Sequence, residues 1–188
     1  MDAANVDLKA FTDEFYHKIT GGHLQPVLDT LKYIKHETEC WLETTTLVVP
    51  GHNDSSEEIQ SMCEWVVKEL GPDVPMHFTA FHPDWKMMDV PSTPVDTLIR
   101  ARTIAMECGV RYAYIGNVRS GEGSNTHCHH CGQLLIERFG YDLGQWNLDK
   151  EGRCSHCQTP VAGVFEPEPG HWGNRRMPVY LHGDISSS

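Results

Sequence analysis

Residues 40–81 read CWLETTTLVVPGHNDSSEEIQSMCEWVVKELGPDVPMHFTAF, and this stretch decides the fold. Its β-branched start predicts a strand over residues 40–49 that ends at a Pro-Gly turn. Capping residues at 54–56 then begin a helix whose apolar residues keep a helical period as far as Gly71. Strand character returns at 74–81. The stretch therefore predicts a strand, helix and strand unit with two parallel strands.

The same alternation continues on both sides of this stretch. Further strands are predicted at 5–10 and 111–115, and further helices at 12–19, 25–35 and about 95–108. The predicted fold class is α/β, a partial (β/α) barrel of parallel strands with ligands at their carboxyl ends. Four strands cannot close a barrel, and the exposed edge of a parallel sheet favours aggregation. We therefore expect either a partner that supplies strands or a chain that is a fragment.

Composition restricts the class of protein. A chain of 188 residues allows one domain with a small appendage, and 39% hydrophobic and 22% charged residues are typical of soluble proteins. No apolar run approaches the roughly 18 residues of a membrane-spanning helix. The net charge of -11 opposes binding to a nucleic-acid backbone. The first residues lack a secretory signal pattern, so we expect a cytoplasmic protein with reduced cysteines and with neither membrane nor nucleic-acid partners.

Two C-x2-C pairs with 22 residues between them predict a structural zinc site at Cys128, Cys131, Cys154 and Cys157. Four thiolates fill a tetrahedral coordination sphere, so the site should stabilise a small zinc ribbon and perform no chemistry. Gly132 and Gly152 should permit the tight turns that aim amides at the sulfurs. Iron, as a single ion or an iron-sulfur cluster, is the competing metal, and four unrelated buried thiols are the simpler alternative. Neighbouring histidines are expected to be bystanders: His127, His129, His130 and His156.

Three segments lie where a parallel sheet places its ligands: VDLKAF at 6–11, LVVPGHND at 47–54 and FTAFHPDWKM at 78–87. Through them the chain resembles the C-terminal half of a radical SAM enzyme of the pyruvate formate-lyase activating type. With YIGNV at 114–118, the cysteine pairs and GHWGNRRMPV at 170–179, it resembles more narrowly the radical SAM component of the AmmeMemoRadiSam system. This resemblance covers about residues 2–182.

The resemblance implies a partial (β/α)6 barrel that holds a [4Fe-4S] cluster and S-adenosylmethionine, whose reductive cleavage forms a 5'-deoxyadenosyl radical. It implies that Asp7 lies near the methionyl carboxylate, with Lys9 as its electrostatic partner, and that His82 contacts the cofactor. Glu43 and Thr45 share one face of their strand and would point into the barrel. A glycyl-radical activase typically carries arginine there.

The chain departs from this family in one decisive respect, because it contains neither a C-x3-C-x2-C motif nor a glycine-rich GGE-like strand end. Three cluster thiolates are therefore missing, and we expect a polypeptide of these residues to be inactive alone. The leading hypothesis is a C-terminal portion with barrel strands four to six. Its partner would be a separate N-terminal half or a protein substrate. The expected domains are the half barrel at 1–120, the four-cysteine zinc ribbon at 121–165 and an extended tail at 166–188.

A second hypothesis, from the class of binding modules, makes the ribbon a protein-interaction module on an α/β scaffold. Within 126–165 the basic residues are only Arg138, Lys150 and Arg153, too few for a dense phosphate track. A third hypothesis, an open zinc hydrolase site at His82 and Asp84, lacks any HExxH-like spacing.

Several single residues have simpler interpretations. Asp7 and Lys9 could form a surface ion pair, and His82 could be satisfied by backbone within its loop. Cys63 falls on the apolar face of its helix and is expected in the core. The tryptophans lack a common period and are expected to pack in the core or ribbon: Trp41, Trp65, Trp85, Trp146 and Trp172.

Overall fold

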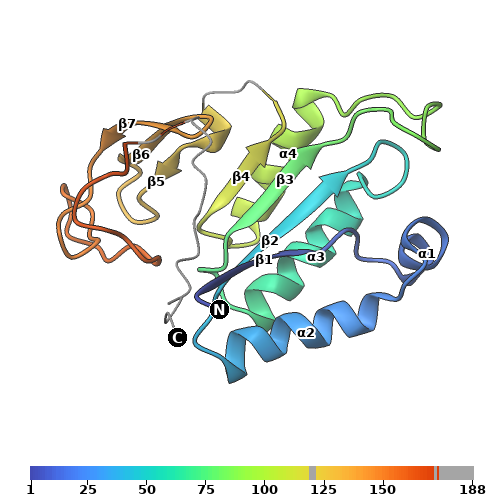
Figure 1. Ribbon diagram of the computed structural model, residues 1–188, viewed down its shortest axis with the longest axis horizontal. Helices are drawn as coiled ribbons and strands as arrows, with labels where there is room; N and C mark the ends of the chain where they lie inside the picture. Colours follow the sequence, from blue (N-terminus) through green and yellow to red (C-terminus); the bar gives the residue numbers. More distant parts are fainter. Residues whose placement is uncertain (119–121, 172, 174–188) are drawn as a thin grey trace, which may run out of the picture.

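A computed structural model of the chain describes residues 1–118, 122–171 and 173 (Figure 1). The elements in chain order are β1 Ala3–Asp7, α1 Asp13–Phe15, the π-helical turn η1 Tyr16–Thr20, α2 Leu24–Glu37, β2 Trp41–Val48, α3 Ser56–Glu69, β3 Met76–Ala80, α4 Val95–Glu107, β4 Ala113–Gly116, the 3-10 turn η2 Glu122–Ser124, β5 Thr126–His127, β6 Leu134–Phe139 and β7 Asp142–Trp146. Each strand and helix expected before residue 119 is present, with its ends moved by a few residues. Among the described residues, no helix is long and apolar enough to cross a membrane.

The first four strands form one sheet in the order β1-β2-β3-β4, and all neighbours run parallel. The register aligns Ala3 with Trp41, and Met76 with both Thr44 and Ala113. A sheet whose spatial order follows its chain order, with a helix in each connection, is the arrangement of a barrel segment. The α/β class predicted from the sequence is confirmed.

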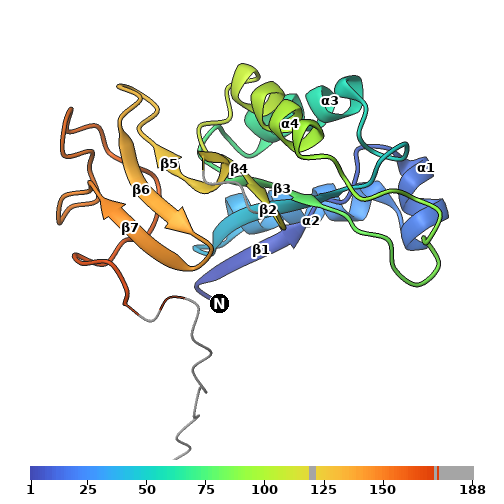
Figure 2. The ribbon, with the colours of Figure 1, turned by 90° about the horizontal axis from the view of Figure 1, so that it is seen from above.

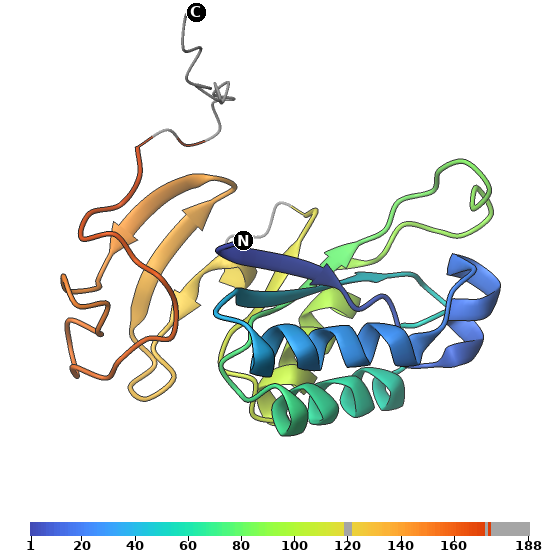
Figure 3. The same ribbon diagram turned by 60° about the horizontal axis from the view of Figure 1, so that its bottom comes forward.

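The long helices α2, α3 and α4 all cover the same face of this sheet (Figure 3). Alternate residues of β2 are buried and half-buried because successive side chains point to opposite faces. The covered face and the helices share the main core, in which Leu8, Met62 and Phe78 are fully buried. Cys63 belongs to this core, as expected. The other face, called here the open face, carries no helix among the described residues.

Strands β5, β6 and β7 form a separate antiparallel sheet, which with the two cysteine loops makes the ribbon. The ribbon has its own small core, which includes Leu135, Ile136 and Val161. It lies beside the amino-terminal ends of the parallel strands (Figures 1 and 2). The ribbon therefore lies near the amino-terminal ends of the parallel strands, whereas the sequence predicts cofactor binding at their carboxyl ends.

Two expectations about aromatic packing are wrong. Trp85 is 80% exposed in the loop after β3, with the Lys86 ammonium 4.3 Å from its ring centre, and it packs in no core. Trp41 lies half-buried on the open face. Trp65 and Trp146 do pack against the main and ribbon cores. Trp172 and most of the predicted tail lie outside the described residues.

Candidate metal centre and the open face

The four predicted cysteines converge in the ribbon, with their sulfur atoms within 4.8 Å of one another. The Sγ atoms of Cys128 and Cys157 lie 3.6 Å apart, and those of Cys131 and Cys154 lie 3.7 Å apart. A tetrahedral ion with metal-sulfur bonds of about 2.3 Å separates its ligand sulfurs by about 3.8 Å. A disulfide would require about 2.05 Å. The arrangement therefore fits one tetrahedral metal ion such as zinc.

The same spacing discriminates against an iron-sulfur cluster in the ribbon. Each thiolate of a four-iron cluster binds a different iron atom, so the sulfurs stand farther apart than around a single ion. Among the described residues, the four cysteines are the one group able to hold a metal ion, and the neighbouring histidines do not belong to it. The rings of His129 and Tyr112 instead lie nearly perpendicular, with centres 6.3 Å apart.

The two C-x2-C loops share one backbone design. The amide of the residue after each pair donates to the carbonyl of the first cysteine: Gly132 to Cys128 at 2.9 Å and Gln158 to Cys154 at 2.8 Å. Both residues have positive φ, 74° for Gly132 and 61° for Gln158. The equivalent of Gly132 is therefore Gln158. The prediction for Gly152 was wrong in detail, because Gly152 closes a different turn by donating to Asp149.

One ligand thiol is prepared for ionisation by its surroundings. The Thr159 hydroxyl, 3.2 Å from Cys157 Sγ, and the Thr159 backbone are the main causes that lower the pKa of the Cys157 thiol to about 5, with smaller contributions from the Cys131 and Cys128 thiols. Metals bind the thiolate, so this contact favours the metal-binding form.

At the carboxyl ends of the strands, the structure brings Asp7 and Lys9 together. Their carboxylate and ammonium groups lie 2.9 Å apart, and the Asp7 side chain is 57% exposed. The buried side chain of Asn53 holds this strand end, because its amide donates to the carbonyls of Lys9 and Leu47 at 2.6 and 2.9 Å. The loop after β2 thus fixes the position of the pair.

The other predicted cofactor residues do not join this pair. Thr45 aligns with Asp7 in the sheet, but its hydroxyl donates to Asn5 at 2.7 Å. His82 is exposed after β3, and its Nδ1 lies 3.3 Å from the carbonyl of Pro83. Glu43 and Thr45 do share the open face, as period two predicts. Glu43 lies nearer the amino end of the strand.

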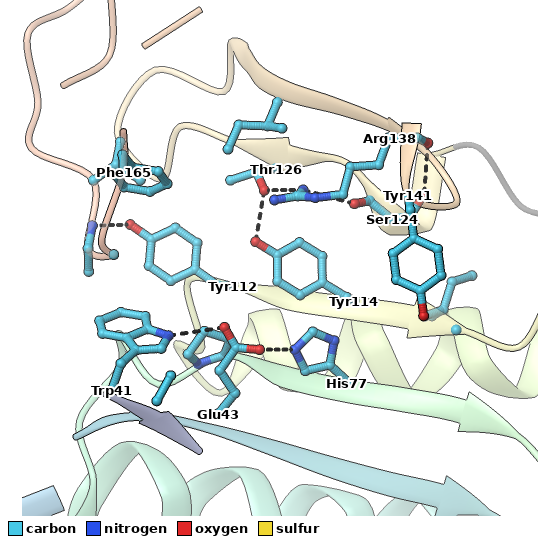
Figure 4. Close-up of a pocket in the computed structure, with 18 of the residues that line it drawn as sticks. Trp41, Glu43, His77, Tyr112, Tyr114, Ser124, Thr126, Arg138, Tyr141 and Phe165 are labelled. Atoms are coloured by element: carbon cyan, nitrogen blue, oxygen red, sulfur yellow. Dashed lines mark hydrogen bonds and ion pairs between the residues drawn. The ribbon is translucent and has the colours of Figure 1, made fainter. Parts of the chain in front are cut away.

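Glu43 is the centre of a polar network on the open face (Figure 4). Its carboxylate accepts a hydrogen bond from the Trp41 indole at 3.0 Å and contacts His77 Nε2 at 2.8 Å. The bond from His77 is the main cause that lowers the pKa of Glu43, although burial opposes it. An ionised carboxylate only accepts hydrogen bonds, so the His77 Nε2 atom is the donor.

The network continues from the sheet into the ribbon. The rings of His77 and Tyr114 stack with centres 5.2 Å apart, and the Tyr114 hydroxyl lies 2.9 Å from that of Thr126 in β5. Arg138 of β6 donates to the Thr126 hydroxyl at 2.6 Å, and its guanidinium carbon lies 5.5 Å from the Tyr114 ring centre. Tyr114 therefore connects the two sheets.

Three residues of this network were not predicted from the sequence: His77, Tyr114 and Arg138. A signal was present for the first two, because each occupies a strand position on the same face as Glu43. Polar and aromatic residues that alternate with core residues mark a face that is not packed against a helix. Arg138 gave no such signal, since its position depends on how the ribbon meets the sheet.

Comparison with known proteins gives one close relative in sequence. No family model matches the chain. An uncharacterized protein of Methanocaldococcus jannaschii, MJ0808, is 46% identical over 162 residues, which are 86% of this chain and 48% of that protein. The chain thus spans about half the length of the curated relative that it matches.

Among solved structures, the chain is similar to a domain of a pyruvate-formate lyase-activating enzyme from Bacteroides vulgatus. The TM-score is 0.54 with 13% identity, over 62% of this chain and 68% of that one. At this identity the likeness concerns the fold.

Proposed function

We propose that this chain forms the carboxyl-terminal part of a radical SAM enzyme of the activase-like type, and that a second polypeptide segment completes its barrel. The observation that carries the proposal is the open face, where polar residues stand on a parallel sheet whose helices all lie on the other side. In a barrel this face lines the lumen. Because four parallel strands are present, the proposed portion holds the last four strands of a six-stranded barrel, one more than the sequence hypothesis assigned.

Three further observations support the proposal. The likeness to the activating-enzyme domain supports the fold. The curated relative is about twice as long as the matched region, which leaves room there for the complementary segment. Asp7 and Lys9 form an ion pair at the strand ends, where we propose that they meet the methionyl group of S-adenosylmethionine. The AmmeMemoRadiSam assignment and a cytoplasmic location belong to the same proposal.

The cysteines of this chain do not fit the [4Fe-4S] cluster of such an enzyme. Cys40 precedes β2, Cys63 lies within α3 and Cys108 follows α4, and the buried Cys63 thiol has its pKa raised to about 12, mainly by burial. The remaining four fit a single ion. We therefore assign no redox step to this chain and propose that the complementary segment supplies the cluster thiolates.

The test mixes this chain with a polypeptide that carries a C-x3-C-x2-C segment. After anaerobic reconstitution with iron and sulfide, S-adenosylmethionine and a reductant are added and 5'-deoxyadenosine is measured. We expect product from the mixture and none from either polypeptide alone. Absence of product from a mixture that holds an intact cluster would contradict the proposal.

A matched pair of variants tests the role of the ion pair. Asp7→Asn should weaken S-adenosylmethionine binding by the mixture, whereas Asp29→Asn, on the exposed surface of α2, should leave it unchanged. Binding is measured by calorimetry, separately from turnover. If both variants bind S-adenosylmethionine with the same affinity, Asp7 and Lys9 form only a surface ion pair and do not contact the cofactor.

A second candidate function is that the ribbon binds a protein, and one observation favours it. Around the turn between β6 and β7, Phe139 is 59% exposed and Tyr141 is 80% exposed. Exposed aromatic side chains are common at protein interfaces. If the ribbon binds a protein, Phe139→Ser should abolish capture of that protein without changing 5'-deoxyadenosine formation by the mixture. A salt-sensitive shift of DNA would contradict this candidate.

A further inference from the structure

A cavity of about 1250 Å³ lies between the open face of the sheet and the ribbon (Figure 4). Its lining residues include Asp2, Trp41 and Pro75, which stand at or before the amino ends of their strands. Asp7, Lys9 and His82 are absent from the lining. The lining also reaches Gly116 and Val118 at the carboxyl end of β4. The cavity thus lies apart from Asp7 and Lys9, and its volume is sufficient for a small organic molecule.

Aliphatic and aromatic side chains line the cavity. They include Trp41, Tyr112, Tyr114, Tyr141 and Phe165. The two central phenols are held in place, because the Tyr112 hydroxyl accepts from the Ala162 amide at 3.1 Å and the Tyr114 hydroxyl pairs with Thr126. Burial raises the pKa of both phenols, so they are neutral at physiological pH. These walls are prepared to receive a flat apolar ring.

Two carboxylates line the cavity, the exposed Asp2 and the half-buried Glu43, and Glu43 lies among the aromatic walls with acceptor positions left. An ionised carboxylate has about four acceptor positions, and Glu43 uses one for Trp41 and one for His77. Its side chain is 32% exposed, although it lies among aromatic rings. The remaining positions suit N-H donors, and a cation gains further from the neighbouring π-faces.

The cavity is also lined by a positively charged side chain, that of Arg138. Its Nη1 donates to the Thr126 hydroxyl at 2.6 Å and to the Ser124 carbonyl at 3.1 Å. The guanidinium also lies over the Tyr114 ring. Arg138 thus serves the contact between ribbon and sheet, whereas Glu43 has acceptor positions left for a ligand.

From these contacts we propose that the cavity binds a small aromatic molecule that carries a protonated amine, with the ring between the aromatic walls and the ammonium at Glu43. The inference does not depend on the radical SAM proposal, because every contact that it uses lies within this chain. Binding is therefore measured on the 188-residue protein with zinc bound.

Three probes carry the same phenyl ring with a different charge, and so distinguish the effect of charge on affinity from the effect of ring burial: 2-phenylethylamine, 2-phenylethanol and 3-phenylpropanoate. Each is titrated at pH 7 while amide and indole resonances of the ¹⁵N-labelled protein are recorded. We expect the amine to bind about tenfold more tightly than the alcohol, and the anion to bind most weakly. The Trp41 indole N-H should shift most. Tightest binding of the anion, or shifts confined to residues outside the cavity, would overturn the proposal.

Two variants locate the charge preference. Glu43→Gln keeps the side-chain size and should bring the affinity for the amine down to that for the alcohol, while Glu37→Gln on the exposed end of α2 should change neither. Should Glu43→Gln not fold, Trp41→Phe keeps an aromatic wall and releases one acceptor position of Glu43. It should retain the preference for the amine. Loss of the preference in Trp41→Phe, or its survival in a folded Glu43→Gln protein, would refute the role of Glu43.

Discussion

At the residue scale, Gly132 and Gln158 provide an internal comparison, because they occupy equivalent positions in the two cysteine loops with positive φ. A Cβ at Gly132 would meet no atom within 4 Å, so only backbone strain opposes a side chain there. We expect Gly132→Ala to lower the free energy of unfolding by about 1 kcal/mol and Gln158→Gly to raise it by less. Chemical denaturation of the zinc-bound protein measures both. The opposite order would show that the two loops are not equivalent.

Glu43 should make stability depend on pH. The hydrogen bond from His77 is the main cause that lowers the pKa of Glu43 in the folded protein. The ionised carboxylate therefore contributes fully to the free energy of unfolding above the unfolded pKa of about 4.3. This contribution is lost as the pH falls through the folded pKa. Glu43→Gln should therefore cost about 1 kcal/mol at pH 7, and the cost should shrink below about pH 4. Urea unfolding of both proteins across this range measures the difference. A cost independent of pH would contradict the role assigned to the hydrogen bond from His77.

At the scale of elements, α3 begins at a cap that was visible in the sequence. The Ser55 hydroxyl accepts from the Glu58 amide at 3.2 Å, and Glu58 does not return the contact to its own cap. Its carboxylate instead accepts from the Phe11 amide at 2.7 Å and so holds the segment after β1. Ser55→Ala should destabilise the protein by about 1 kcal/mol, whereas Ser61→Ala, in the interior of the same helix, should be nearly neutral. Thermal unfolding compares them.

The strands and helices could be predicted from the sequence, but the contacts between the two sheets could not. Local periodicity predicted β2, α3 and β3 because each buries one face against a common core. The four metal ligands followed from their spacing alone. The contact between Tyr114 and Thr126 could not be predicted, because it depends on the path of the chain between β4 and β5. The contact of Glu43 with His77 joins neighbouring strands of the parallel sheet, and the cofactor role of Glu43 stays a prediction.

At the scale of the whole molecule, the ribbon and the parallel sheet have separate cores. The ribbon core is small, so its stability should depend on the metal. Addition of a strong chelator should therefore expose β6 amides to rapid hydrogen exchange and abolish binding in the cavity, while β2 and β3 remain protected. Simultaneous loss of protection in both sheets would show that the metal stabilises the entire chain.

The completion of the sheet at β1 is the central claim, and the backbone of β1 tests it. Within the described residues, β1 pairs with β2 alone. Because the Leu8 amide donates to Thr45 and the Asp2 carbonyl accepts from Trp41, the amides of Ala3, Asn5 and Asp7 point to the free edge. Hydrogen exchange at these three amides, measured by NMR with and without the complementary segment, is the most direct test. We predict that all three become protected when the segment is added, and exchange unchanged in a mixture that forms a complex would contradict the account.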